Sequence, residues 1–332
     1  MKNCILIFFL FAFTFSLAQT NEISGQYYQN LPAYNPSHTG MNNFLDINMG
    51  FRQQWVGFNS APKNVYLSAY GILKANKRKS HAIEVQAAAD EEQHANPGVF
   101  RKHGLGGYVM SNTQGSYKQR EIAAVYAYHI PLMRGTYVSV GMSPSLYSEK
   151  IDMDITVKDQ MNDESYQSLL SNGNSYSSLQ LNIGVSVYSD KFYLSYSMRQ
   201  AGKLSLSGNR DVFSSTLTKR HHIMGGIVFH ASPKLDIIPN TFIRLDETRP
   251  ALYEVGVRAR YNQYVWAGLS YRNDRTILGA FGILFRDKYK FSYSYEHKNL
   301  GISKDFGISN SSGGTHEILI GVQLFKHNKE AF

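Results

Sequence analysis

The sequence predicts an all-β protein, a transmembrane up-and-down antiparallel β-barrel of about fourteen strands. Three observations predict it: apolar and polar residues alternate along most of the chain, the alternating segments are long and even in number, and the connections between them alternate in length. In residues 178–187, for example, every second residue is Leu, Ile or Val, and those between are Ser, Gln, Asn or Gly. Such a strand fits either a sheet that faces water on one side or a barrel with a wet lumen.

The N-terminus reads as a secretory signal peptide, residues 1–18. Lys2 precedes an apolar run that is too short to span a bilayer as a helix, and Ala18 fits a peptidase that cleaves after a small residue. The only cysteine, Cys4, lies in the part to be removed. The mature chain is therefore expected to be exported and to have no disulfide bond.

The composition agrees with a membrane barrel. The chain is 43% hydrophobic, 13% aromatic and 18% charged, with a mean hydropathy of -0.31. Beyond the signal peptide no continuous apolar run is long enough for a helical span, and a barrel needs none because half of each strand faces the lumen. The net charge of +9 does not indicate nucleic acid, because an exported chain first meets the cell envelope. Outer-membrane lipid is the expected surrounding.

Alternation and turn residues together place the strands. Most have about ten or more residues, enough to cross a bilayer when tilted. The predicted ranges are 44–54, 63–73, 101–112, 116–130, 134–147, 176–188, 191–199, 219–230, 234–245, 250–261, 264–272, 275–286, 288–296 and 315–326. The domain prediction is then an N-terminal plug or periplasmic strap over 19–43, a barrel over 44–326 and a tail over 327–332.

The lengths of the connections set the predicted orientation. Bacterial barrels have short periplasmic turns and longer external loops, with both termini in the periplasm. Connections after the fourth, sixth, eighth, tenth and twelfth strands are tight, whereas 152–175, 200–218 and 298–314, which follow odd-numbered strands, are long. Residues 74–100 are the exception, because this long segment follows the second strand; a further strand at 81–85 would change the count.

Charged residues fall on the predicted lumen face. Glu254, Arg258 and Arg260 alternate with apolar residues of one strand, and Lys288, Lys290 and Glu296 do so on another. Burying an isolated charge costs several kcal/mol, so these positions indicate water or a ladder of paired charges. The alternative, a soluble β-sandwich whose outer face is wet, remains open at this point.

No catalytic or metal-binding pattern is found. His221 and His222 are adjacent, so on a strand their side chains leave opposite faces and cannot share an ion. Neither a zinc-protease motif nor a nucleophile elbow occurs. Asp152 and Asp154 could bind calcium weakly, although a solvated loop is the interpretation that we favour. We expect no enzymatic activity, no cofactor and no metal.

Two blocks carry a family resemblance. Residues 26–40 read QYYQNLPAYNPSHTG, followed by RQQWVGF at 52–58, and GGTHEI at 313–318 opens the last strand. These resemble the PorP/SprF family of type IX secretion system outer-membrane proteins, known from Bacteroidota. Residues 104–109 and 126–132 resemble the next two strands of that family. The segment 74–100 is longer than the usual connection of the family.

The resemblance implies an outer-membrane barrel that takes part in exporting cell-surface proteins or in gliding. Its expected partners are a secreted cargo protein or its C-terminal signal domain, and other type IX secretion components in the periplasm. The candidate partner-binding residues are Tyr34, Asn35, Pro36, Arg52, Trp55, Phe58, Lys77, Arg78 and Lys79. For single residues a structural interpretation competes with docking: Trp55 in the interfacial aromatic girdle, Arg52 paired in the lumen, and the three basic residues in a solvated turn.

Two other function classes compete with a secretion accessory. A passive outer-membrane porin for small solutes fits a fourteen-stranded barrel if the lumen is open. An outer-membrane phospholipase would need a nucleophile with a base, and the sequence offers no such constellation. Independently of the resemblance, Pro32 and Pro36 fix φ and remove two donors, which favours an extended or turn-rich N-terminal segment over a helix.

Overall fold

A computed structural model describes residues 24–73, 102–133, 135–153, 163–208, 218–298 and 314–325. The N-terminal part contains three short helical turns: η1 (Tyr27–Gln29), α2 (Leu31–Tyr34) and η2 (Pro36–His38). The strands are β1 (Leu45–Gln53), β2 (Lys63–Leu73), β3 (Lys102–Gln114), β4 (Tyr117–Met133), β5 (Thr136–Ile151), β6 (Ser175–Ser189), β7 (Phe192–Gly208), β8 (Arg220–Ile227), β9 (Phe229–Ser232), β10 (Leu235–Asp246), β11 (Leu252–Tyr261), β12 (Val265–Arg272), β13 (Thr276–Phe285), β14 (Tyr289–Lys298) and β15 (Thr315–Leu324). Helix α3 (Glu164–Asn172) lies between β5 and β6.

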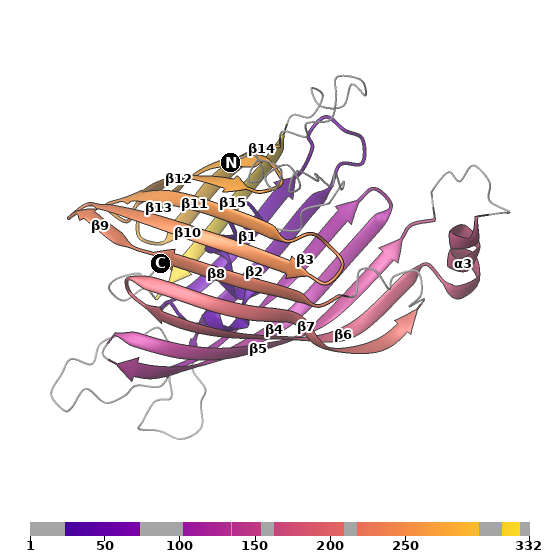
Figure 1. Cartoon of the computed structure of the whole chain (residues 1–332), viewed down its shortest axis with the longest axis horizontal. Coiled ribbons are helices and arrows are strands. Elements are labelled where there is room, and N and C mark those ends of the chain that lie inside the picture. Colours follow the sequence, from indigo (N-terminus) through magenta and orange to yellow (C-terminus); the bar gives the residue numbers. More distant parts are fainter. Residues whose placement is uncertain are drawn as a thin grey trace, which may run out of the picture.

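The strands form a closed antiparallel barrel in which sequence neighbours are also neighbours in space (Figure 1). Two pairings close the ring: β15 with β1, where Arg52 lies opposite Glu317, and β10 with β11. Strands β8 and β9 are one path past Val228, since both pair with β10, so the barrel has fourteen strands. The predicted all-β, up-and-down barrel is confirmed.

The predicted strand ranges differ from the structure in details with local causes. The predicted strand 219–230 is interrupted at Val228, where the facing part of β10 contains Pro239, which has no N–H to donate. The Val228 N–H donates to the carbonyl of Lys191 at 2.7 Å. The predicted loop 152–175 contains α3, a helix that sequence reading missed. Its N-cap is Asp163, whose side chain accepts the N–H of Tyr166 at 2.9 Å.

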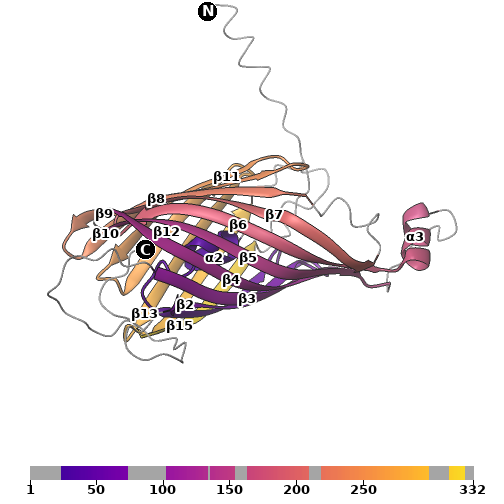
Figure 2. The same cartoon turned by 90° about the horizontal axis from the view of Figure 1, so that it is seen from below.

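Short turns join the strands at one end of the barrel. Asn262 and Gln263 both have positive φ, as do Arg286 and Asp287, which is the geometry of tight hairpin turns that match the twist of the flanking strands. β2 ends and β3 begins at this same end. The connections at the opposite end include α3, which lies beyond the barrel in Figures 1 and 2. The segment 74–100, the predicted signal peptide 1–18 and the predicted tail 327–332 lie outside the described residues.

The two faces of the barrel wall differ as predicted. Outward residues are apolar and exposed: Val140 is 54% exposed, Ile122 56% and Leu269 64%. Inward residues are polar and buried, among them Ser139 at 0% and Ser143 at 2%. An outer face that is apolar around the ring belongs in lipid rather than in water. Exposed aromatic residues flank the short turns, as in the interfacial girdles of such barrels: Phe192, Tyr261, Tyr264, Phe285 and Tyr289.

Candidate functional site

The N-terminal segment, residues 24–43, lies inside the barrel and crosses its lumen. In Figure 2 α2 lies within the ring of strands. Tyr27, Asn35, Ser37 and Thr39 are all 0% exposed. The segment contacts strands on several sides of the ring, so it fills the cross-section instead of lining one wall.

The form of this segment corrects the expectation drawn from its prolines. The sequence disfavoured helix, yet α2 is a single helical turn with Pro32 in its first turn, and η2 begins at Pro36. Proline is tolerated there because the N–H groups of the first turn have no partner within the helix. The Asn35 side chain caps η2 by accepting the N–H of Ser37 at 3.0 Å.

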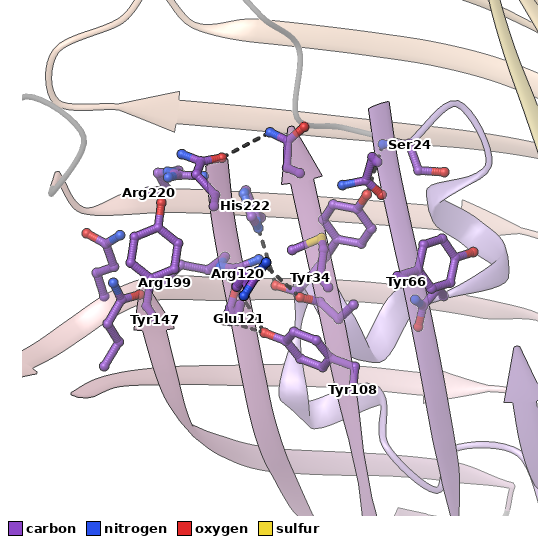
Figure 3. A pocket seen from close by; sticks show the side chains of 18 of the residues that line it. Ser24, Tyr34, Tyr66, Tyr108, Arg120, Glu121, Tyr147, Arg199, Arg220 and His222 are labelled. Carbon is purple, nitrogen blue, oxygen red and sulfur yellow. Dashed lines mark hydrogen bonds and ion pairs between the residues drawn. The ribbon is translucent and has the colours of Figure 1, made fainter. Parts of the chain in front are cut away.

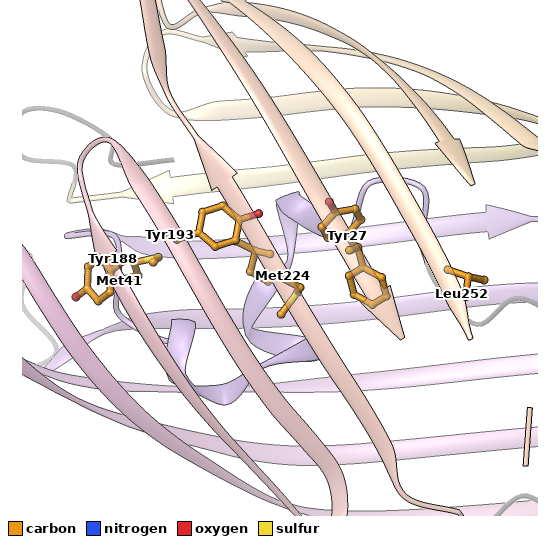
Figure 4. Packing of buried hydrophobic residues seen from close by; sticks show 8 residues of the cluster. Tyr27, Met41, Tyr188, Tyr193, Met224 and Leu252 are labelled. Atoms are coloured by element: carbon orange, nitrogen blue, oxygen red, sulfur yellow. The ribbon is translucent and has the colours of Figure 1, made fainter. Parts of the chain in front are cut away.

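Apolar packing holds one side of the N-terminal segment against the wall. Figure 4 shows Tyr27 and Met41 facing residues of β6, β7, β8 and β11. The Tyr27 ring lies 4.9 Å from the ring of Phe242, measured between centroids, and its hydroxyl accepts a hydrogen bond from Asn240 Nδ2 at 2.6 Å. The cluster consists of Tyr27, Leu31, Met41, Tyr188, Tyr193, Met224, Phe242 and Leu252. Burial of these large side chains favours the docked position.

Inward side chains of the wall satisfy the carbonyl groups of the N-terminal segment. Ser197 Oγ donates to the carbonyl of Tyr34 and Ser139 Oγ to that of Ser37, each at 2.8 Å. His129 Nε2 donates to the carbonyl of Thr39 at 2.8 Å, while the hydroxyl of Tyr188 donates to His129 Nδ1 at 2.8 Å and so fixes the tautomer. An irregular backbone inside a barrel needs such partners, because each unsatisfied buried group costs free energy.

Three glycines let the backbone of the segment lie directly on the wall. A Cβ added to Gly104 of β3 would lie 1.9 Å from the Thr39 carbonyl oxygen. One added to Gly141 of β5 would lie 2.3 Å from Ser37 N, and one on Gly184 of β6 would lie 1.9 Å from Asn35 Oδ1. Any larger residue at these positions would displace the segment. The strands are therefore shaped to receive it.

Paired charges line the wall where the long connections begin. Arg272 joins two carboxylates, with Nη2 2.6 Å from Glu254 Oε2 and Nη1 3.3 Å from Glu296 Oε2. Arg52 Nη2 lies 2.9 Å from Glu296 Oε2, and its Nε lies 3.9 Å from Glu317 Oε2. All five side chains are nearly fully buried. This is the charge ladder that alternation indicated, and it ties β11, β12, β14, β15 and β1 together.

The ladder also holds the first described residues of the chain. Glu317 accepts the N–H of Gly25 at 2.9 Å and the hydroxyl of Ser24. A second inward pair lies across the lumen, where Arg199 Nη2 is 2.5 Å from Glu121 Oε2 and Nη1 donates to the carbonyl of Ala33 at 3.4 Å. The N-terminal segment is thus bound at its start and near its middle by charged groups of the wall.

The predicted partner-binding residues fall into three places. Tyr34, Asn35 and Pro36 lie inside the lumen with the N-terminal segment; Asn35 and Pro36 are buried and Tyr34 is half-buried. Arg52 is 4% exposed and paired in the lumen, the structural interpretation given above. Lys77, Arg78 and Lys79 lie outside the described residues.

Trp55 and Phe58 lie in the turn that follows β1, at the end of the barrel that carries the long connections. Phe58 is 38% exposed and Trp55 is half-buried with φ of 48°. The Val56 N–H donates to the carbonyl of Gly314 at 3.0 Å. The N-terminal and C-terminal blocks that resemble the family, far apart in sequence, therefore meet where β1 pairs with β15.

Within the described residues, no group of three or more His, Cys, Asp and Glu residues could hold a metal ion. Asp152 instead pairs with Lys118, 2.5 Å away, and with Lys150, 3.5 Å away. No helix in the described ranges is both long and apolar enough to cross a membrane.

Several residues of the site carried no recognisable signal in the sequence. Ser139, His129 and Gly184 fit the alternating pattern as ordinary inward residues, and nothing in it shows that they contact residues about a hundred positions or more away. Glycines within a strand, as in the run Gly104 to Gly107, permit a bend or a bulky neighbour. At Gly104 that neighbour is the backbone of Thr39.

The solved structure of an outer-membrane barrel shows the same fold. The Ralstonia pickettii toluene transporter TbuX matches with 9% identity and a TM-score of 0.50, over 89% of this chain and 93% of that chain. The Pseudomonas putida toluene transporter TodX matches with 9% identity, a TM-score of 0.45, and coverage of 92% and 95%. Outer membrane phospholipase A of Escherichia coli matches with 10% identity and a TM-score of 0.39, over 86% of this chain and 94% of that chain. No similar sequence was found among curated proteins.

The family is shown by sequence rather than by these distant structures. The model of the family described as type IX secretion system membrane protein PorP/SprF matches residues 16–322. This range includes the N-terminal segment and nearly all of the strands. Together with the apolar outer face and the closed barrel, it places the protein in the outer membrane. The chain belongs to the PorP/SprF family of type IX secretion system membrane proteins.

Proposed function

We propose that this protein is a non-enzymatic component of the type IX secretion system that supports export or surface docking of a cargo protein, with its lumen closed by residues 24–43. The observation that carries the proposal is the contact of this segment with the wall. Its carbonyl groups accept hydrogen bonds from Arg199, Ser197, Ser139 and His129, and glycines give it room. Because residues 24–43 occupy the lumen, we expect the barrel to act through the surfaces at its two ends.

A passive porin is the competing function. A porin passes solutes through a water-filled lumen, whereas here apolar packing and hydrogen bonds occupy the cross-section. TbuX is named as a toluene transporter. Transport of such an apolar solute would need an apolar path through the barrel, whereas the inward residues here are mainly polar. Conductance in planar bilayers separates the two functions: the proposal expects little current from the wild-type protein, and steady open-channel current would overturn it.

Docking of cargo is assigned to the end of the barrel with the long connections. The exposed Phe58 and the half-buried Trp55 lie there, beside Gly314 at the start of β15, and aromatic residues commonly anchor protein partners. The loops at 152–175 and 298–314 belong to the same end, and the cargo or its C-terminal signal domain is the expected occupant. Lys77, Arg78 and Lys79 follow β2 at the opposite end, where periplasmic components of the secretion system are expected.

The double substitution Trp55→Ala with Phe58→Ala tests the docking surface. It should lower recovery of the cognate surface protein with the tagged barrel from its own envelope, while the barrel keeps its normal level and heat-modifiable migration. Phe285→Ala is the matched control, since Phe285 is a 57% exposed aromatic residue at the short-turn end. Equal recovery with the double variant and the control would remove the docking role from these residues.

Deletion of residues 77–92 tests the periplasmic end. We expect a folded, heat-modifiable barrel with lowered export of its cognate surface protein, because a loop can carry partner specificity while the barrel stays fixed. Normal export at normal barrel levels would show that the segment is only a tolerated insertion.

A further inference from the structure

A row of basic side chains lies on the outer face of the wall, near the end with the long connections. Lys63 of β2 lies opposite Thr113 of β3, Thr113 lies opposite Lys118 of β4, and Lys118 lies opposite Lys150 of β5. Arg120 is the next outward residue of β4 after Lys118. These four cations, Lys63, Lys118, Arg120 and Lys150, form the basic row. Neither the closed lumen nor the cargo docking proposed above makes use of this surface.

The side chains of the basic row point away from the lumen. On the same strands, Tyr66, Glu121 and Tyr147 point inward, and Figure 3 shows them around the inner space of the barrel. Each lies an odd number of residues from the lysine on its strand, so alternation places the lysines on the opposite face. Arg120 lies between Gln119 and Glu121, which are 8% and 2% exposed, and is itself exposed. Its side chain therefore leaves the wall on the outer face as well.

An apolar row borders the basic row on the side of the short turns. Its members pair in register on the same four strands and are between 47% and 56% exposed: Leu67, Val109, Ile122 and Leu146. This row belongs to the lipid-facing surface. With a rise of about 3.3 Å per residue and a tilt of about 40°, Arg120 lies about 5 Å and Lys118 about 10 Å beyond Ile122 along the membrane normal. The polar layer of a bilayer is about 5–8 Å thick on each side, so the basic side chains lie within reach of the lipid head groups.

The positive charge of the basic row is accessible and is not balanced by the protein. Lys118 and Lys150 lie directly opposite each other, an arrangement that destabilises a strand pair when the charges are alike. Both contact the one carboxylate of Asp152, at 2.5 and 3.5 Å, yet their side chains remain 39% and 54% exposed. Lys63 and Arg120 are exposed too, and within the described ranges no acidic side chain pairs with either. One carboxylate therefore faces four cations.

We propose that the basic row binds the phosphate groups of lipopolysaccharide in the outer leaflet of the membrane. In bacterial barrels the end with the long connections faces the cell surface, so the leaflet beside this row is the outer one. A lipid with an anionic head and acyl chains matches the basic row and the apolar row beneath it at once, whereas an acidic protein segment matches the basic row alone. Arg and Lys are the usual partners of phosphate, and a phosphate between Lys118 and Lys150 supplies the charge that Asp152 does not.

The experiment titrates the purified full-length protein in detergent with lipid A, the phosphorylated anchor of lipopolysaccharide, and counts bound lipid by native mass spectrometry. Lipid A from which both phosphates have been removed is the matched probe, since it keeps the same acyl chains. Diphosphoryl lipid A should bind saturably and about tenfold or more tighter than the dephosphorylated form. Lys63→Gln with Arg120→Gln removes the two cations that have no carboxylate partner. It should weaken diphosphoryl lipid A about tenfold and leave the dephosphorylated form unchanged.

Arg286→Gln with Lys288→Gln is the matched control, since it removes an exposed Arg and an exposed Lys at the short-turn end. It should leave binding of both lipids unchanged, and heat-modifiable migration shows that each variant is folded. Two competitors identify the source of the phosphate: neither phosphatidylglycerol nor inorganic phosphate should displace diphosphoryl lipid A at equal concentration.

The proposal is overturned if the dephosphorylated lipid binds as tightly as the diphosphoryl form, if the two double variants bind lipid A equally, or if either competitor displaces it at equal concentration. Such a result would leave the closed lumen and cargo docking untouched, because those are measured by conductance and by export.

Discussion

Substituting Gly184 with Val tests whether the wall holds the N-terminal segment in place. Gly184 faces inward on β6, and a Cβ there would lie 1.9 Å from Asn35 Oδ1. Relief of this overlap requires the segment to move, and overpacking of this kind costs about 1–3 kcal/mol. Movement also breaks the bond from Asn35 Nδ2 to the carbonyl of Tyr196, 3.2 Å long and worth about 1 kcal/mol.

The sum, about 2–4 kcal/mol, shifts the equilibrium between docked and undocked segment by roughly 30- to 1000-fold. Valine suits a strand, so the barrel itself should form. Two assays follow the segment: conductance in planar bilayers, which should rise, and cleavage by chymotrypsin, which should become faster at Tyr27, Tyr28 and Tyr34. Chymotrypsin is the suitable protease because the described residues before Arg52 contain no Lys or Arg.

Gly279→Val is the matched control. Gly279 faces outward on β13, and a Cβ there would meet only Leu269 Cδ2 at 3.8 Å, an ordinary contact. It should neither open the lumen nor expose the N-terminal segment to protease. If Gly184→Val retains the low conductance and the protease resistance of the wild type, the segment is not held by the close approach described here, and the reasoning fails.

Three further predictions concern the wall, the charge ladder and pH. Val140→Arg places a charge on the lipid face, which costs about 2–4 kcal/mol at the bilayer midplane and should block assembly. Ser139→Arg should assemble, but it should displace the N-terminal segment, because Ser139 Oγ no longer donates to the Ser37 carbonyl. Equal yields of heat-modifiable barrel from the two variants would contradict this assignment of faces. Arg272→Met leaves Glu254 and Glu296 buried without this partner and should lower the free energy of unfolding by about 3–5 kcal/mol, measured by urea titration in detergent. The double variant Arg272→Met with Glu254→Gln should recover part of that loss, because one of the two buried charges is removed. Burial lowers the pKa of His38 to about 3, with His129 nearby adding to the effect, so the docked segment holds this ring neutral. Docking is then fully stable above the ordinary pKa near 6.5 and weakens as pH falls toward 3; cleavage by chymotrypsin should be faster at pH 5 than at pH 7, and His38→Gln should reduce that difference. A pH-independent cleavage rate would show that His38 is not neutral in the docked state or that the segment opens without exposing it.

The sequence alone determined the class of fold and the side of each strand. A period of two is a local property, so Val140 and Ser139 could be assigned to opposite faces without knowing their neighbours. The even number of strands and the alternation of short and long connections then fixed an up-and-down ring. Charge at Glu254 and Glu296 indicated water or a ladder of paired charges, since an isolated buried charge is too costly.

Only the tertiary structure decided what fills that ring. Strand periodicity identifies inward positions, but it cannot say whether an inward Ser or Gly faces water or a segment from elsewhere in the chain. Gly184 and Asn35 are far apart in sequence, and they meet only because closing the barrel brings β6 around the N-terminal segment. The partners of Arg52 were likewise undetermined, since Glu296 and Glu317 reach it only once β15 pairs with β1 and closes the ring.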